Sequence, residues 1–247
     1  MQIQETKIIL LSPPQNVENE HQILVQLFEL GLQCFHLRKP DFSDIEYAQY
    51  LGQIPTEYWD RIVLHHHHHL AEQLSLGGVH LTERSRQNLD AMTLLKKIEA
   101  YQAGHLKVSA AIHDLKDLEL LGQWCDYVLI SPIFDSISKK EYKANSKLDL
   151  APYLGKVKSK LFALGGIKVE NVEFAFEKGF EGVAVLGYVW ESPNQAIRNY
   201  EKLRKVHQPK QKDNLKTLLQ SIVKDVLEEQ KQPKPPLSTT HPYVLQR

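Results

Sequence analysis

The feature of this sequence that most constrains its fold is a regular alternation of short apolar runs with stretches of helical periodicity. Each run is nearly continuous in apolar residues, which is typical of parallel strands covered on both faces. We expect eight strands, at residues 7–12, 34–39, 61–66, 77–82, 107–112, 126–131, 160–166 and 182–187. Between them, apolar residues recur at spacings of three and four, which predicts helices at 18–30, 44–52, 92–100, 115–122, 169–178 and 194–206.

Eight strands, mostly followed by helices, within about 200 residues fit a (β/α)8 barrel, the TIM barrel, better than an open doubly wound sheet. Ligands of such barrels bind at the carboxyl ends of the strands, and a phosphate often binds after strands seven and eight. Gly166 and Gly187 stand at those two ends. Glycine has no Cβ, so an anion can approach the backbone N–H groups there. The glycines therefore favour a phosphate site, and the alternative is that they only form tight turns.

The composition changes at about residue 207: none of the 12 Gly lies beyond it, whereas five of the 12 Pro do. We therefore divide the chain into a barrel, 1–207, and an appended amphipathic helix with a Pro-rich tail, 208–247. The helix is expected to pack on the barrel or on a second copy in a homo-oligomer. The alternative is a tail that recognises a partner.

Charge and cysteine content exclude several classes of protein. Lys plus Arg and Asp plus Glu each number 30, so no global positive field is available to bind nucleic acid. The apolar run at 8–11 is too short for a signal peptide or a membrane span. Two cysteines cannot form a secreted disulfide framework. We therefore expect a cytoplasmic protein whose partners are small phosphorylated molecules, with no nucleic acid and no membrane.

The second predicted strand carries His36 and Arg38 on one face, because side chains alternate with period two. If that face is the barrel interior, the guanidinium points into the site. An arginine there is costly unless it meets an anion, which indicates a phosphate or pyrophosphate ligand. A purely structural pair with a carboxylate is the alternative.

The loop after the sixth strand places Ser136 and Ser138 just before Lys139. Hydroxyls followed by lysines suit a loop that wraps a phosphorylated ligand, and a solvated polar loop is the alternative.

Five consecutive histidines, at 65–69, close the third strand and open the following helix. We expect His65 to face the site and the other four to turn mostly outward. Metal capture by an i, i+4 pair such as His65 and His69 is chemically feasible, but adventitious binding is the favoured interpretation because no carboxylate or cysteine cluster accompanies the run.

Several short motifs follow one another in a specific order. They read Phe-His-Leu-Arg at 35–38, Gly-Val-His-Leu at 78–81, Asp-Tyr-Val at 126–128, Ser-Pro-Ile-Phe at 131–134, Ala-Leu-Gly-Gly-Ile at 163–167 and Gly-Val-Ala-Val at 182–185. In this order and spacing, the chain resembles the thiamine phosphate synthase and thiazole tautomerase superfamily over roughly residues 6–205.

The resemblance implies a thiamine biosynthesis transferase. Thiamine phosphate synthases join hydroxymethylpyrimidine diphosphate to a thiazole phosphate and release pyrophosphate through a dissociative, cation-like transition state. The resemblance places Arg38 and Lys139 on the pyrophosphate. It places Ser136, Ser138, Gly166 and Gly187 around the thiazole phosphate.

The chain departs from the synthase pattern where that family binds magnesium. The Asn-Asp pair of the family aligns with His65 and His66, and its second aspartate falls near Ser85. Mg²⁺ prefers hard oxygen ligands, so magnesium is a weakly supported cofactor here, with Glu83 as a partial substitute, and the metal ligands stay unknown. His36 stands where synthases usually have glutamine, a substitution that tautomerase-like members share.

Two alternatives to a synthase stay open. A tautomerase-like isomerase would use His36 or His65 as general acid or base, since imidazole exchanges protons near pH 7. Its usual histidine after the sixth strand is replaced by Pro132. A non-catalytic thiazole or thiamine phosphate-binding protein would need no cations at the pyrophosphate end, so Arg38 and Lys139 favour the synthase.

Overall fold

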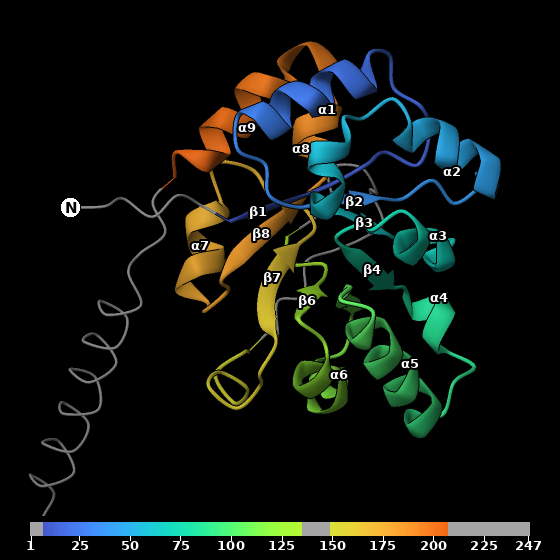
Figure 1. Ribbon diagram of the computed structural model, residues 1–247. Coiled ribbons are helices and arrows are strands. Elements are labelled where there is room, and N and C mark those ends of the chain that lie inside the picture. The colour runs from blue at the N-terminus through green and yellow to red at the C-terminus, as the bar shows by residue number, and fades with distance from the viewer. Residues whose placement is uncertain (1–6, 135–148, 207–247) are drawn as a thin grey trace, which may run out of the picture. The chain divides into compact units, whose positions relative to one another are not determined.

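The computed structural model describes residues 7–134 and 149–206, which form a closed barrel of eight parallel strands in the order of the sequence (Figure 1). The strands are β1 (Ile8–Leu11), β2 (Phe35–Leu37), β3 (Ile62–Leu64), β4 (Gly78–Leu81), β5 (Lys107–Ile112), β6 (Tyr127–Ile130), β7 (Lys160–Leu164) and β8 (Gly182–Val185). The barrel closes at β1, where Leu10 lies opposite Phe35 of β2 on one side and Val185 of β8 on the other. The predicted (β/α)8 fold is confirmed.

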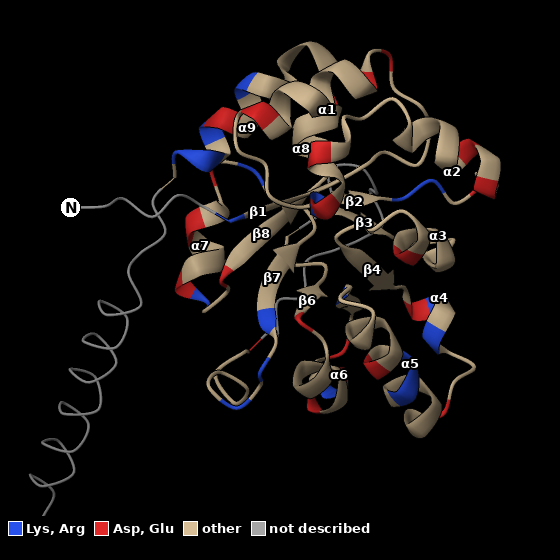
Figure 2. Ribbon diagram, viewed as in Figure 1, with Lys and Arg blue, Asp and Glu red and all other residues tan. Residues whose placement is uncertain are grey.

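Helices surround this barrel (Figure 1). They are α1 (Glu20–Glu29), α2 (Asp44–Leu51), α3 (His68–Gln73), α4 (Glu83–Arg86), α5 (Ala91–Ala103), α6 (Leu118–Trp124), α7 (Val172–Glu177), α8 (Gly187–Trp190) and α9 (Ala196–Arg204). Short 3₁₀ helices are η1 (Thr56–Arg61), η2 (Leu115–Asp117) and η3 (Pro193–Gln195). The one-turn helices α4 and α8 are too short to give a periodic signal, and neither was predicted. Charged residues of both signs are spread over the outer helices, and the strands carry few of them (Figure 2).

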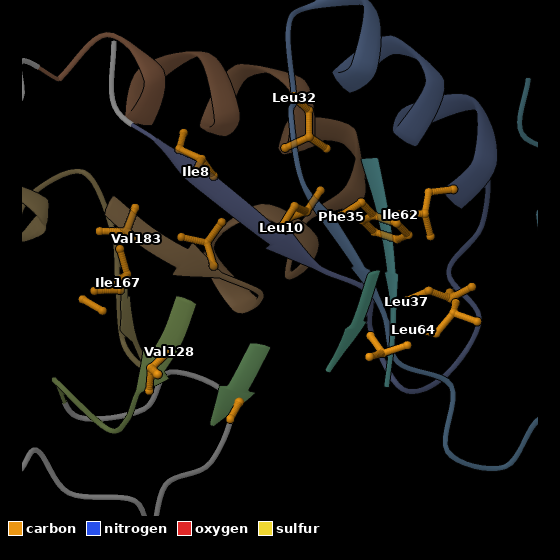
Figure 3. Close-up of a cluster of buried hydrophobic side chains, with 14 of the residues drawn as sticks. Ile8, Leu10, Leu32, Phe35, Leu37, Ile62, Leu64, Val128, Ile167 and Val183 are labelled. Carbon is orange, nitrogen blue, oxygen red and sulfur yellow. The ribbon is translucent and has the colours of Figure 1, made fainter. Parts of the chain in front are cut away.

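Alternating strand residues divide the buried interior into two parts. Outward-facing residues such as Leu10, Phe35 and Ile62 pack in the layer between the strands and the helices (Figure 3). A second cluster fills the inside of the barrel: Ile9, Leu11, Tyr127, Leu129, Phe162 and Ala184. Burial on both faces explains the nearly continuous apolar runs of the strands.

A buried ion pair anchors the end of β2. Lys39 is 0% exposed, and its Nζ lies 2.7 Å from Oε2 of Glu20 on α1. The hydroxyl of Tyr50 on α2 donates to Oε1 of Glu20 at 2.7 Å. A charge without its partner is very unfavourable at such a depth. The pair therefore ties α1 and α2 to the residue that follows Arg38.

The loop residues Ser136, Ser138 and Lys139 and the extension at 208–247 lie outside the described residues. Their predicted roles, the division of the chain near residue 207 and the homo-oligomer stay predictions. Within the described part of the chain, no helix is both long enough and apolar enough to cross a membrane.

Candidate active site

A pocket of about 450 Å³ lies at the carboxyl ends of the strands. Its lining residues come from the strand ends or the loops that follow them; they include Ser12, Arg38, His65, His80, Thr82, Ala111, Ser131, Gly165, Gly166 and Gly187. This is the end of the barrel at which ligands bind in this fold. Of the predicted site residues that the structure describes, Arg38, His65, Gly166 and Gly187 meet at this pocket, whereas His36 is absent from its lining.

A second pocket, of about 470 Å³, opens at the opposite end of the barrel. Lys7, Gly77, Lys107 and Lys160 line it, and they lie at or next to the first residues of their strands. None of the predicted site residues that the structure describes lines this second pocket. We therefore place the candidate active site at the carboxyl ends.

Arg38 supplies a positive charge to the candidate site. Its backbone N–H donates to Oγ of the buried Ser12 at 2.7 Å, so the main chain is fixed independently of the side chain. The side chain is half-buried, and none of the described carboxylates forms an ion pair with it. The structural alternative, a pair with a described carboxylate, is therefore not realised. A half-buried, unpaired guanidinium is suited to an anionic ligand.

The glycine side of the pocket is formed by the ends of β7 and β8. Gly165 and Gly166 have φ angles of 99° and 65°, in the left-handed region that favours glycine. The side-chain amide of Asn171 donates to the carbonyl oxygen of Gly166 at 2.9 Å and fixes this turn. Gly187 follows β8 after one residue, Leu186, and begins α8. Glycines at the ends of both strands thus expose their backbone to the same pocket.

Three histidines lie at and beneath the floor of the pocket. His65 and His80 line it, whereas His36 is 0% exposed inside the barrel. Nδ1 of His36 lies 2.9 Å from Nε2 of His65, and Nε2 of His36 lies 2.6 Å from the hydroxyl of Tyr127. Nδ1 of His80 lies 2.9 Å from Oγ of Ser109. These hydrogen bonds make the burial of the polar groups tolerable.

Burial keeps the three rings uncharged near neutral pH. It lowers the pKa of His36 to about 3 and the pKa values of His65 and His80 well below the ordinary 6.5. The positive charge of Arg38 also contributes to the lowered pKa values of His65 and His80. A cationic imidazole is therefore not available here at pH 7, which disfavours His36 or His65 as a proton carrier that titrates near neutrality.

The rest of the histidine run only partly follows its prediction. His69 is exposed and lies beside Asp44, as predicted for an outward residue. His66, in contrast, lines the pocket, and His68 is half-buried with Nδ1 at 3.1 Å from the hydroxyl of Tyr101. The outward prediction is wrong for these two. The helix α3 begins only at His68, so the strand end carries His66 inward, and the ring of His68 packs against Tyr101 of α5.

The described residues form one histidine cluster that could hold a metal ion, and it contains His65 with His36 and His80 rather than with His69. Sequence reasoning missed His80 and Tyr127. Both residues occupy inward-facing positions in the alternation of side chains along β4 and β6. His80 lies opposite Ser109 of β5, and Ser109 lies opposite Tyr127. That register requires pairing between strands and is not visible in one strand alone.

A closed (β/α)8 barrel whose carboxyl-end pocket joins glycine turns to an arginine with no ion pair among the described residues is typical of barrel enzymes that bind phosphorylated ligands. The family profile described as thiamine monophosphate synthase matches residues 8–189. The chain belongs to the thiamine monophosphate synthase family, so the predicted resemblance is confirmed.

Individual relatives agree with this assignment. The thiamine-phosphate synthase of Flavobacterium psychrophilum is 25% identical over 201 residues, which cover 76% of this chain and 93% of the relative. A crystal structure of thiamine phosphate pyrophosphorylase from Bacteroides thetaiotaomicron is similar with a TM-score of 0.63 and 30% identity, over 81% of this chain and 96% of that one. The thiamine phosphate pyrophosphorylase of Pyrococcus furiosus, at 20% identity and a TM-score of 0.62 over 81% of this chain and 94% of that one, shares the fold.

The family is generally magnesium-dependent, but the donor set at this pocket does not fit Mg²⁺. Among the described lining residues, Glu83 is the only carboxylate, and the others include His65, His66, His80 and His113. Mg²⁺ requires oxygen ligands in octahedral geometry, and imidazole is a poor substitute. The described donor set therefore does not form a magnesium site.

Proposed function

We propose that this chain is a thiamine biosynthesis transferase that couples hydroxymethylpyrimidine diphosphate to thiazole phosphate and releases pyrophosphate. The observation that carries the proposal is a pocket that combines, at different strand ends, glycine turns and an arginine without an ion pair to any described carboxylate. Two phosphorylated substrates need two separate places for anions. Family membership supports the same reaction.

Arg38 would bind the diphosphate of the pyrimidine substrate. As the bond to this leaving group breaks, negative charge develops on its bridging oxygen. A guanidinium held beside that oxygen stabilises the transition state more than the ground state. Arginine is also suited to two parallel hydrogen bonds with phosphate oxygens.

Gly166 and Gly187 would hold the phosphate of the thiazole substrate through backbone N–H groups. Phosphate sites after strands seven and eight are frequent in this fold. The positive φ of Gly166 turns the backbone at the pocket, and the absence of a Cβ permits a close approach.

Three residues outside the described part of the chain complete the proposed site. Ser136 and Ser138 would donate hydroxyl hydrogen bonds to the thiazole phosphate. Lys139 would add a second positive charge at the pyrophosphate. All three follow β6 and Pro132 in the sequence.

His65 would contact the substrates at the floor of the pocket as a neutral ring, with His36 as a positioning residue beneath it. Their hydrogen bond of 2.9 Å fixes the orientation of His65. His36 does not itself line the pocket, so it would act only through His65.

The decisive experiment incubates the protein with both precursors and measures thiamine phosphate and pyrophosphate, with and without Mg²⁺. A parallel reaction offers the thiazole carboxylate phosphate isomer alone, which a tautomerase would convert. We expect coupling and no isomerisation. Isomerisation without coupling, or tight binding of thiazole phosphate with neither reaction, would contradict the proposal.

A further inference from the structure

Three imidazole side chains lie together at and beneath the floor of the pocket. Barrel interiors are filled mainly by bulky branched apolar side chains. Here the neighbouring strands β2 and β4 and the end of β3 between them each carry one histidine side chain directed to the same place. One ring nitrogen of each of His36, His65 and His80 lies within 4.8 Å of the others, and all three residues are buried.

Hydrogen bonds to oxygen determine which ring nitrogen carries the lone pair in two of the three histidines. Oγ of Ser109 donates to the carbonyl oxygen of Val79 at 3.4 Å, so it can accept a hydrogen bond from Nδ1–H of His80. The lone pair of His80 then resides on Nε2. In the same way, the hydroxyl of Tyr127 can accept from Nε2–H of His36 at 2.6 Å, which leaves the lone pair on Nδ1.

That arrangement has the form of a metal site in which two of the three histidines already have a supporting contact to oxygen. Metal-binding histidines generally donate their second ring N–H to an oxygen, which fixes the tautomer and the ring orientation. The partner of the His36 lone pair is Nε2 of His65, at 2.9 Å. Metal–nitrogen bonds of about 2.0–2.1 Å place tetrahedral ligand nitrogens about 3.4 Å apart, so small rotations of the rings would suffice.

We propose that His36, His65 and His80 form a binding site for one late first-row divalent cation, with Zn²⁺ as the preferred ion. Neutral imidazole is a good ligand for zinc and a poor one for magnesium. Three histidines leave the fourth position of a tetrahedral ion open, as in zinc sites that bind water or substrate. This proposal does not depend on the proposed coupling reaction.

The open position would face the ligand pocket. His65 and His80 line that pocket, which also provides an entry path for the ion, whereas His36 closes the site from below. Arg38 lies at the same pocket, so the cation and the guanidinium would both attract one anionic ligand. The chemistry of the site therefore fits an oxygen of a phosphate as the fourth ligand.

The test titrates the full chain, produced without a polyhistidine tag and stripped of metal by a chelator, with Co²⁺ and then with Zn²⁺. Tetrahedral Co²⁺ absorbs visible light much more strongly than octahedral Co²⁺. We expect one equivalent of tetrahedral Co²⁺ per chain, displaced by Zn²⁺. His80→Gln is expected to weaken this binding by 100-fold or more.

The sequence offers a matched control for adventitious capture. His67 and His69 both lie beside Asp44 on the outside of the barrel. The double variant His67→Gln, His69→Gln removes both of these imidazoles from the histidine run, and we expect it to keep the tetrahedral signal unchanged. Loss of the signal in this variant, together with its retention in His80→Gln, would overturn the proposal.

A more conservative variant tests the metal site if His80→Gln fails to fold. Ser109→Ala keeps all three imidazoles and removes only the hydroxyl that orients His80. Loss of such a supporting contact is expected to weaken metal binding by about 10-fold to 100-fold. Unchanged affinity in a folded Ser109→Ala protein, or no tetrahedral signal in the unmodified chain, refutes the site.

Discussion

Replacing Arg38 with alanine is the most direct test of the proposed leaving-group site. Two unit charges about 4 Å apart attract each other by about 1 kcal/mol in water and about 4 kcal/mol at an effective dielectric constant of about 20. Arg38 is half-buried at the rim of the pocket, so its environment lies between these limits. We therefore expect a loss of about 2 kcal/mol of transition-state stabilisation, which is a roughly 30-fold lower kcat/KM for coupling.

The assay follows thiamine phosphate under initial-rate conditions and compares Arg38→Ala with Arg38→Lys. Lysine keeps the charge but loses the paired N–H donors, so its loss should be smaller. Stability should hardly change, because only the backbone of Arg38 bonds to Ser12. Lys107→Ala is the matched control, since it removes a cation at the opposite end of the barrel. An Arg38→Ala protein within twofold of the parent would refute the reasoning.

Three further predictions concern binding and stability. Gly166→Val should weaken binding of thiazole phosphate in calorimetric titration. The control is Gly155→Val: Gly155 has a similar positive φ of 74° but lies away from the pocket, so this variant should lose stability without losing affinity. Equal affinities of the two variants would exclude a phosphate site at Gly166. Glu20→Ala leaves Lys39 as a buried charge without its partner and should lower the free energy of unfolding in urea by about 3 kcal/mol; a change below about 1 kcal/mol would mean that the pair is not structural. Ser43→Ala removes the capping box of α2 and should lower the same quantity by about 1 kcal/mol, and no change would show that the cap is dispensable.

The sequence by itself determined the barrel and its functional end. Buried parallel strands have continuous apolar runs, and helices have apolar residues at spacings of three to four, so both kinds of element can be recognised from the local sequence. Counting the predicted strands along the chain places the glycines at the ends of strands seven and eight and Arg38 at the end of strand two. Helix α5 was underestimated at 92–100, because Ala91 and the polar residues near Ala103 continue a helix that has no apolar signal at its ends.

Only the tertiary structure decided what the histidines do. The sequence predicts that His65 closes the third strand, and the partner it offers for metal binding is His69, four residues further along the same run. In the folded chain, His65 belongs to the strand end, and its neighbours in space are His36 and His80 from adjacent strands. Barrel closure sets this register, and it also buries the rings, which lowers their pKa values and changes their chemistry. Neither the register between strands nor the burial of a polar side chain is encoded locally, since both arise only when distant segments pack together.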